Sequence, residues 1–143
     1  MVLNRQNKVR VELAPLETFL KKVRTVARIA NREVTVCLVS DAEMARMNRA
    51  YRRKRGPTDV LSFPATATKR GTEREPQGFL GDIAIAPETA RRYAQQNGRT
   101  LRDELRVLIL HGVLHLLGHD HETDHGEMDR IERRLRRKLG FAS

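Results

Sequence analysis

The stretch HGVLHLLGHDH, residues 111–121, holds four of the five histidines of this chain. It continues the apolar run ELRVLIL, so we expect a deeply buried helix and not a surface one. His111 and His115 are four residues apart, a spacing that puts both side chains on one face of a helix. Gly118 favours the left-handed backbone that ends a helix. The turn that follows can return His121 to the point shared by the other two imidazoles.

The donor set predicts a metal ion with an open position. Three neutral imidazoles leave a fourth position for water, which is typical of catalytic zinc sites, whereas structural sites are usually closed by cysteines. The chain has one cysteine, Cys37, and it lies in the strand-like segment VTVCLV. We therefore predict about one Zn²⁺ per chain, held by His111, His115 and His121. Another divalent transition metal is the alternative, because nickel, copper and iron also accept imidazole.

One position argues against proteolysis. The pattern H-x-x-x-H-x-x-G-x-x-H has the ligand spacing of metzincin proteases, in which a glutamate follows the first histidine and acts as general base. Here that position is Gly112. A peptidase needs this carboxylate to activate water against an amide. A phosphodiester fits better, because an arginine can stabilise the developing charge through its bidentate fork.

Three polar residues around the third histidine have more than one interpretation. We expect His119 to lie beside the ligands or at the surface, with direct ligation the less favoured alternative. Asp120 is a candidate to hydrogen-bond a ligand, although a helix-terminal turn often contains an aspartate for other reasons. His125 is interpreted as a polar residue near the start of the last helix.

The net charge of +10 at pH 7 indicates a positive field that attracts polyanions such as nucleic acid. The alternative is that surface arginine only keeps the protein soluble. The longest uncharged stretch, residues 107–119, is well short of the roughly 20 apolar residues that span a bilayer. The N-terminus has charges throughout and no export signal. We therefore expect a cytoplasmic protein without a membrane partner.

Periodicity predicts one α/β (α+β) domain over residues 1–143, with a small mixed four-stranded sheet covered by about five helices. One of these is the zincin-like helix that bears the histidines. The expected strands are KVRVEL (8–13), 33–39, 59–63 and 79–86. The expected helices run from Pro15 to Asn31, over 41–51, from Pro87 to Asn97, from Thr100 through the histidines, and along the stripe Met128, Ile131, Leu135 and Leu139.

Three blocks of the sequence resemble the YbeY family of metal-dependent endoribonucleases, which are rRNA maturation factors. HGVLHLLGHDH resembles the family signature H-G-x-L-H-L-x-G-y-D-H. YRRKRGPTDVLSFP, residues 51–64, is similar to Y-R-x-K-x-x-P-T-D-V-L-S-F-P, and LGDIAI, residues 80–85, to L-G-D-I-x-I. The blocks fall in the family's order, and with the flanking helices the resemblance covers the chain from Val9 to Phe141.

The resemblance implies cleavage of single-stranded RNA, with roles in maturing the 3′ end of small-subunit rRNA and in ribosome quality control. The implied partners are RNA and the small ribosomal subunit. It implies zinc binding by His111, His115 and His121, and a functional arginine, Arg52, beside them. The alternative for Arg52 is that it is one more charge in the run RRKR.

The resemblance also implies a cleft at the end of the sheet. Asp59 and Asp82 would lie near it, and Ser62 is a further candidate, although strand-terminal aspartates often only cap turns. One departure is His119, where the family commonly has tyrosine; it adds a titratable group. A second is the basic ending RRLRRKL, which either strengthens RNA contact or forms a solvated helix face.

Two rival functions remain. A zinc hydrolase of amides or small molecules would keep the three ligands, but it would not need this much positive charge. A non-catalytic protein that binds RNA or the ribosome, with a structural metal, would lose stability without its metal. The sequence predicts neither the oligomeric state nor the general acid and base.

Overall fold

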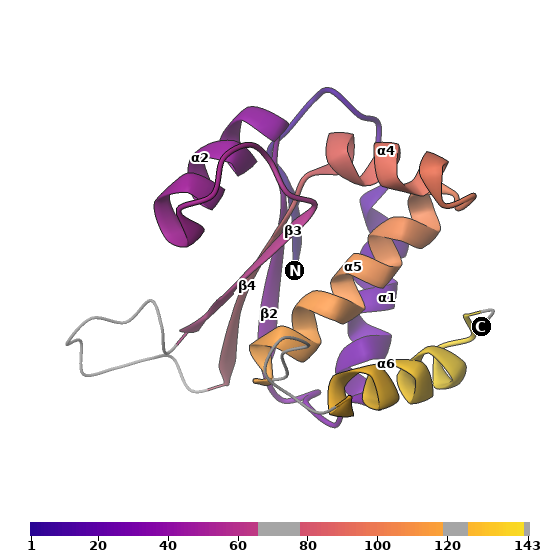
Figure 1. The fold of residues 1–143 in the computed structure, drawn as a ribbon. Helices are drawn as coiled ribbons and strands as arrows, with labels where there is room; N and C mark the ends of the chain where they lie inside the picture. Colours follow the sequence, from indigo (N-terminus) through magenta and orange to yellow (C-terminus); the bar gives the residue numbers. More distant parts are fainter. Residues whose placement is uncertain (66–77, 119–125, 142–143) are drawn as a thin grey trace.

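A four-stranded sheet with helices on both of its faces forms the framework of residues 1–65, 78–118 and 126–141, which the computed structural model describes (Figure 1). The elements in chain order are β1 (Val2–Asn4), α1 (Leu13–Val26), β2 (Glu33–Leu38), α2 (Asp41–Arg52), β3 (Val60–Pro64), β4 (Phe79–Ile85), α4 (Pro87–Gln96), α5 (Leu101–Leu116) and α6 (Glu127–Lys138).

The sheet has the strand order β1-β2-β4-β3. β1 pairs with β2 and β2 with β4 in parallel, whereas β3 pairs with β4 in antiparallel orientation. β3 is therefore an edge strand. The mixed four-stranded sheet and the five described helices confirm the predicted fold class.

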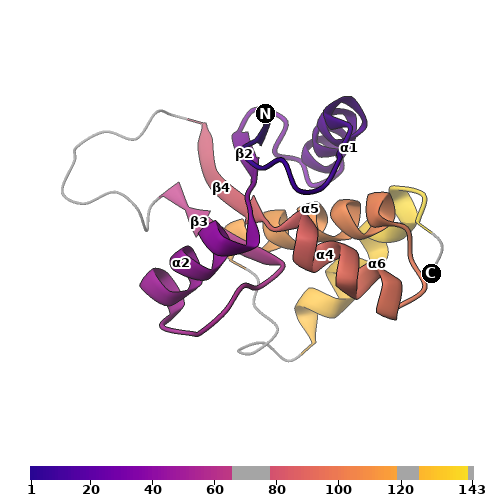
Figure 2. The same ribbon diagram turned by 90° about the horizontal axis from the view of Figure 1, so that it is seen from above.

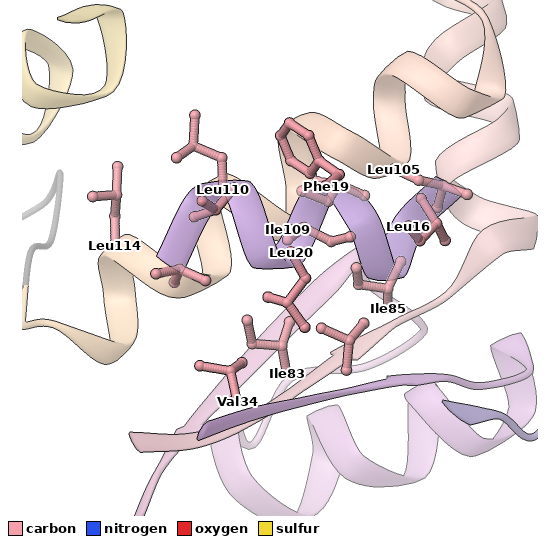
Figure 3. Packing of buried hydrophobic residues seen from close by; sticks show 14 of the residues in the cluster. Leu16, Phe19, Leu20, Val34, Ile83, Ile85, Leu105, Ile109, Leu110 and Leu114 are labelled. Atoms are coloured by element: carbon pink, nitrogen blue, oxygen red, sulfur yellow. The ribbon is translucent and has the colours of Figure 1, made fainter. Parts of the chain in front are cut away.

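The two faces of the sheet carry separate apolar clusters. Side chains alternate along a strand, so Ile83 and Ile85 of β4 point to one face and Ala84 to the other. The larger cluster joins the sheet to α1, α5 and α6, and Figure 3 shows its centre. The smaller cluster joins the sheet to α2; it consists of Val39, Met44, Leu61, Ala84 and Ala86. Figure 2 shows α2 and α1 on opposite sides of β2 and β4. The helix that bears the histidines is thus in the larger core.

Two predicted helix starts are confirmed in detail. Ser40 Oγ accepts a hydrogen bond from the backbone N–H of Glu43 at 3.1 Å, at the start of α2. Thr100 Oγ1 accepts one from Asp103 N–H at 3.1 Å, at the start of α5. Each cap satisfies an amide that the first helical turn leaves without a partner.

The predicted first strand, residues 8–13, is wrong. The side chain of Gln6 closes a turn there, because its Oε1 accepts from Lys8 and Val9 amides and its Nε2 donates to Val9 O. Val9 is buried. The alternation of apolar residues thus reflects burial of a side chain, and it does not show that the segment pairs with a strand. β1 is instead Val2–Asn4, whose partners are residues 36–38 of β2.

The first helix also differs from its predicted bounds. α1 begins at Leu13, two residues before Pro15, and ends at Val26 and not at Asn31. Arg28 has a left-handed backbone with φ of 63°, which ends the helical run.

Within the described ranges, no helix is long and apolar enough to cross a membrane.

Candidate metal and catalytic site

The helix α5 is held tightly against the sheet at the level of the first histidine. Gly112 is buried and packs on β4, where an added Cβ would lie 2.8 Å from both Cδ1 and Cγ2 of Ile83. Ser62 of β3 donates a hydrogen bond from its Oγ to Gly112 O at 3.1 Å. These contacts to β3 and β4 hold the part of α5 that carries His111 against the sheet.

The same packing explains the missing glutamate. Since even a methyl group at position 112 would collide with Ile83, the metzincin carboxylate cannot be accommodated there with α5 in this position. The structure thus supports the prediction that this site does not use the protease base.

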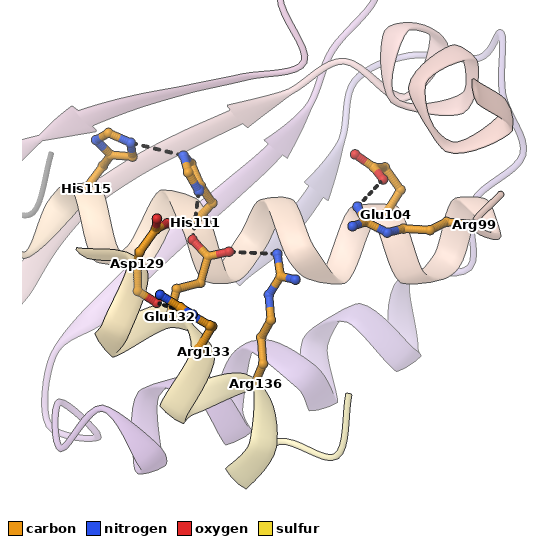
Figure 4. Close-up of polar contacts among 8 residues, drawn as sticks. All are labelled: Arg99, Glu104, His111, His115, Asp129, Glu132, Arg133 and Arg136. Atoms are coloured by element: carbon orange, nitrogen blue, oxygen red, sulfur yellow. Dashed lines mark hydrogen bonds and ion pairs between the residues drawn. The ribbon is translucent and has the colours of Figure 1, made fainter. Parts of the chain in front are cut away.

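The two histidines of α5 meet at their Nε2 atoms, as Figure 4 shows. His115 Nε2 lies 3.2 Å from His111 Nε2, and the ring centroids are 4.8 Å apart. Two nitrogen ligands of a tetrahedral zinc, each at 2.0–2.1 Å from the ion, stand about 3.3–3.4 Å apart. The pair therefore fits a shared zinc ion. Without a metal, one Nε2–H can donate to the other nitrogen at this distance.

A carboxylate from the last helix contacts the other ring nitrogen of His111. Glu132 of α6 is buried, and its Oε1 lies 3.2 Å from His111 Nδ1. Its Oε2 accepts a hydrogen bond from Arg136 at 2.6 Å. The sequence analysis missed Glu132. The available signal was its position four residues after Met128 and three before Leu135, which puts a carboxylate on the apolar side of α6.

The predicted third ligand cannot be placed. His121, His119, Asp120 and His125 lie outside the described residues. In the ranges that are described, no group of three or more His, Cys, Asp or Glu side chains is arranged to hold a metal ion. The ligand set thus stays a prediction, with two of its members in contact.

Arg52 is not brought against the histidines. It is the exposed last residue of α2, on the sheet face opposite α5. Its neighbour Tyr51 packs edge-on against Phe63 of β3, with 5.0 Å between the ring centroids. The edge strand β3 therefore separates Arg52 from His111 and His115. No hydrogen bond or ion pair joins its guanidinium to any described residue.

The three candidate cleft residues have different surroundings. Ser62 faces α5, as described. Asp59 precedes β3, where its backbone O accepts from Ala86 N–H, at the end of the strand away from His115. Its Oδ1 accepts from Thr58 Oγ1 at 3.4 Å.

Asp82 lies on the α2 face of the sheet, because it alternates with Ile83, which packs on α5. Burial raises the pKa of the Asp82 carboxyl. Burial, followed by the nearby charge of Asp82, raises the pKa of the Cys37 thiol. Asp82 thus belongs to the surroundings of Cys37, and no described contact joins it to the histidine pair.

Fold and site together define a class of protein: a small α/β domain in which a buried helix carries two imidazoles in contact, with a carboxylate at the other ring nitrogen of one of them. Similarity to known proteins identifies the family within this class. A family model described as Endoribonuclease YbeY matches residues 1–140. The endoribonuclease YbeY of Koribacter versatilis is 43% identical over 143 residues, which cover all of this chain and 88% of that protein. That of Aquifex aeolicus is 37% identical over 134 residues, or 94% of this chain and 85% of that protein.

A solved structure agrees with these sequence relatives. The solution structure of a Thermotoga maritima protein matches with a TM-score of 0.63 at 28% identity, over 97% of this chain and 89% of that one. The chain belongs to the YbeY endoribonuclease family, as its three sequence blocks predicted.

Proposed function

We propose that the protein is a zinc-dependent endoribonuclease that cleaves single-stranded RNA during rRNA maturation and ribosome quality control. Family membership makes it an endoribonuclease with a role in rRNA processing. The observation that carries the metal dependence is the 3.2 Å approach of the His111 and His115 Nε2 atoms on one buried helix. We further propose that residues 1–143 act as one domain.

His111, His115 and, by sequence, His121 are the proposed zinc ligands. Once bound, zinc supplies a Lewis acid that polarises water or a phosphate oxygen. The chain contributes a rigid support for this ion, because Gly112 and Ser62 fix α5 on the sheet. Neutral imidazole is also a ligand for nickel, copper and iron, so metal analysis of the purified protein decides which ion is native.

Arg52 is proposed to bind a phosphate of the RNA. Residues 52–55, Arg-Arg-Lys-Arg, are all exposed, and no carboxylate in the described ranges neutralises Arg52. A strand of RNA that passes over the edge strand β3 could reach both Arg52 and the histidines. The arginine fork would then hold a phosphate of this strand. It would stabilise the charge that develops at the scissile phosphate only where the path of the strand brings that phosphate within reach of Arg52.

The attacking group is either water or the RNA 2′-hydroxyl. The second route leaves a 2′,3′-cyclic phosphate and the first does not, so analysis of the cleaved ends separates them. The proposed partner in the cell is the small ribosomal subunit, in the cytoplasm. The +10 net charge supports a polyanionic partner, and cleavage should weaken steeply with salt, unlike hydrolysis of a small neutral substrate.

The test compares four proteins purified in parallel: wild type, His115→Ala, Arg52→Glu and the control Arg91→Glu. Arg91 is an exposed arginine of α4, so its replacement changes the net charge equally. Each protein is assayed on single-stranded and duplex RNA oligomers, and its metal content is measured.

We expect wild type and Arg91→Glu to cut single strands and to carry metal. His115→Ala should lose both properties, whereas Arg52→Glu should keep its metal and lose cleavage. Equal cleavage by all four would indicate a contaminating nuclease, and the non-catalytic binding protein would then be the better account. If Arg52→Glu and Arg91→Glu lose cleavage equally, Arg52 contributes only to the overall positive charge and has no specific role.

A further inference from the structure

We propose that Glu132, held by Arg136, is a positioning residue for the metal site: it accepts the Nδ1–H of His111 and so directs the Nε2 lone pair of His111 to the point shared with His115. This inference rests on the proposed function, since it concerns how the chain prepares two of its ligands.

The contact with Glu132 favours one tautomer of His111. An ionised carboxylate only accepts hydrogen bonds, so Glu132 Oε1, at 3.2 Å, requires a proton on His111 Nδ1. In the neutral ring, Nε2 is then left with its lone pair, and this is the atom that faces His115 Nε2. A carboxylate behind a ligating imidazole fixes its tautomer and orientation and makes it more basic.

Arg136 holds the carboxylate in place. Glu132 and Arg136 lie one turn apart on α6, and the guanidinium donates to Glu132 Oε2 at 2.6 Å. Burying a carboxylate is costly unless a charge and hydrogen bonds compensate it, and here Arg136 and His111 occupy different oxygens. The glutamate side chain is 12% exposed, so solvent contributes little to holding it.

The alternative is that Glu132 only helps to dock α6 on α5. The chain offers a matched control for this, because Glu104 is the other buried glutamate of the described ranges. Glu104 lies on α5 itself and is paired with Arg99 at 3.1 Å, away from the histidines (Figure 4). Replacing Glu104 therefore removes a buried charge from α5 without removing a contact to either histidine.

The experiment uses the full chain as wild type, Glu132→Gln, Glu132→Ala and Glu104→Gln. The first readout is the zinc dissociation constant, measured by competition with a chelator. Loss of such a supporting partner typically weakens metal affinity by about 10–100-fold, and we expect this range for Glu132→Ala. Glu132→Gln should lose less, because its amide oxygen can still accept from Nδ1–H. Glu104→Gln should bind zinc as wild type does.

The second readout is the tautomer of His111 in the zinc-free protein, from long-range ¹H–¹⁵N spectra, which also show whether the ring is neutral. We expect Nδ1–H in wild type and Glu104→Gln, and a shift toward Nε2–H in Glu132→Ala. A purely structural role would leave this readout unchanged. If Glu132→Ala does not fold, the isosteric Glu132→Gln carries the affinity test.

Two failures are distinguishable. If wild type binds no metal, the proposed function fails. If wild type binds zinc and both Glu132 variants bind it equally well with the same His111 tautomer, the role of Glu132 is refuted while the zinc site stands.

Discussion

The substitution Gly112→Ala tests whether α5 is held at contact distance from β4. The added Cβ would lie 2.8 Å from Cδ1 and Cγ2 of Ile83 and 3.1 Å from its Cγ1. Ile83 has no exposed surface, so it cannot move aside without disturbing its neighbours. Extra methyl groups in a packed core cost about 1–3 kcal/mol. Alanine in place of glycine inside a helix returns about 1 kcal/mol. We therefore expect a net loss of up to about 2 kcal/mol in the free energy of unfolding.

The assay is urea unfolding of the two proteins at one pH, with equal slopes required for the comparison. The sign is diagnostic, because helix preference alone would make the variant more stable by about 1 kcal/mol. In an Ile83→Ala background, which removes all three close carbon atoms, Gly112→Ala should become stabilising. A Gly112→Ala protein more stable than wild type in the native background would refute the close contact, and with it the explanation for the absent glutamate.

Three further predictions concern the surroundings of the site. Thr100→Ala removes the cap of α5 and should lower the free energy of unfolding by about 1 kcal/mol in urea titrations; no change would show that the cap contributes nothing. Ser62→Ala removes the bond to Gly112 O and should cost about 0.5–1.5 kcal/mol in the same assay, less if water replaces the hydroxyl. Burial raises the pKa of the Asp82 carboxyl above 3.8, its value in the unfolded chain. The native state therefore binds this proton more tightly than the unfolded state does. Stability from this group is therefore lost as the pH rises above 3.8 through the folded pKa. Asp82→Asn should gain in melting temperature over wild type as the pH rises to 7; the opposite trend would contradict a destabilised carboxylate.

The histidine pair could be predicted because its signal is local. Two imidazoles four residues apart on an apolar helix must share a face, whatever surrounds the helix. The caps at Ser40 and Thr100 are local in the same sense, since each bonds within its own first turn.

Other features depend on partners far away in the chain. β1 has three residues, too few for a period, and exists because β2 pairs with it. The alternation in residues 8–13 is real, but the side chain of Gln6 takes the backbone groups that a strand would need. Strand periodicity separates Asp82 from Ile83, but it does not say which face α5 covers.

Glu132 shows a different limit. Its position on the apolar side of α6 is visible in the sequence, yet only the packing of α6 beside α5 brings its carboxylate to His111. A buried carboxylate on an apolar stripe is thus a useful signal for a residue that supports a site from a distant part of the chain.

The most direct test of the metal endoribonuclease is to strip the purified protein with a chelator and to follow circular dichroism and cleavage of single-stranded RNA on the same sample. The apolar clusters on both faces of the sheet do not include the histidines. We therefore predict that the fold is retained, that cleavage is lost, and that about one Zn²⁺ per chain restores it. Undiminished cleavage by the stripped protein would contradict the account, and unfolding on stripping would instead indicate a structural metal.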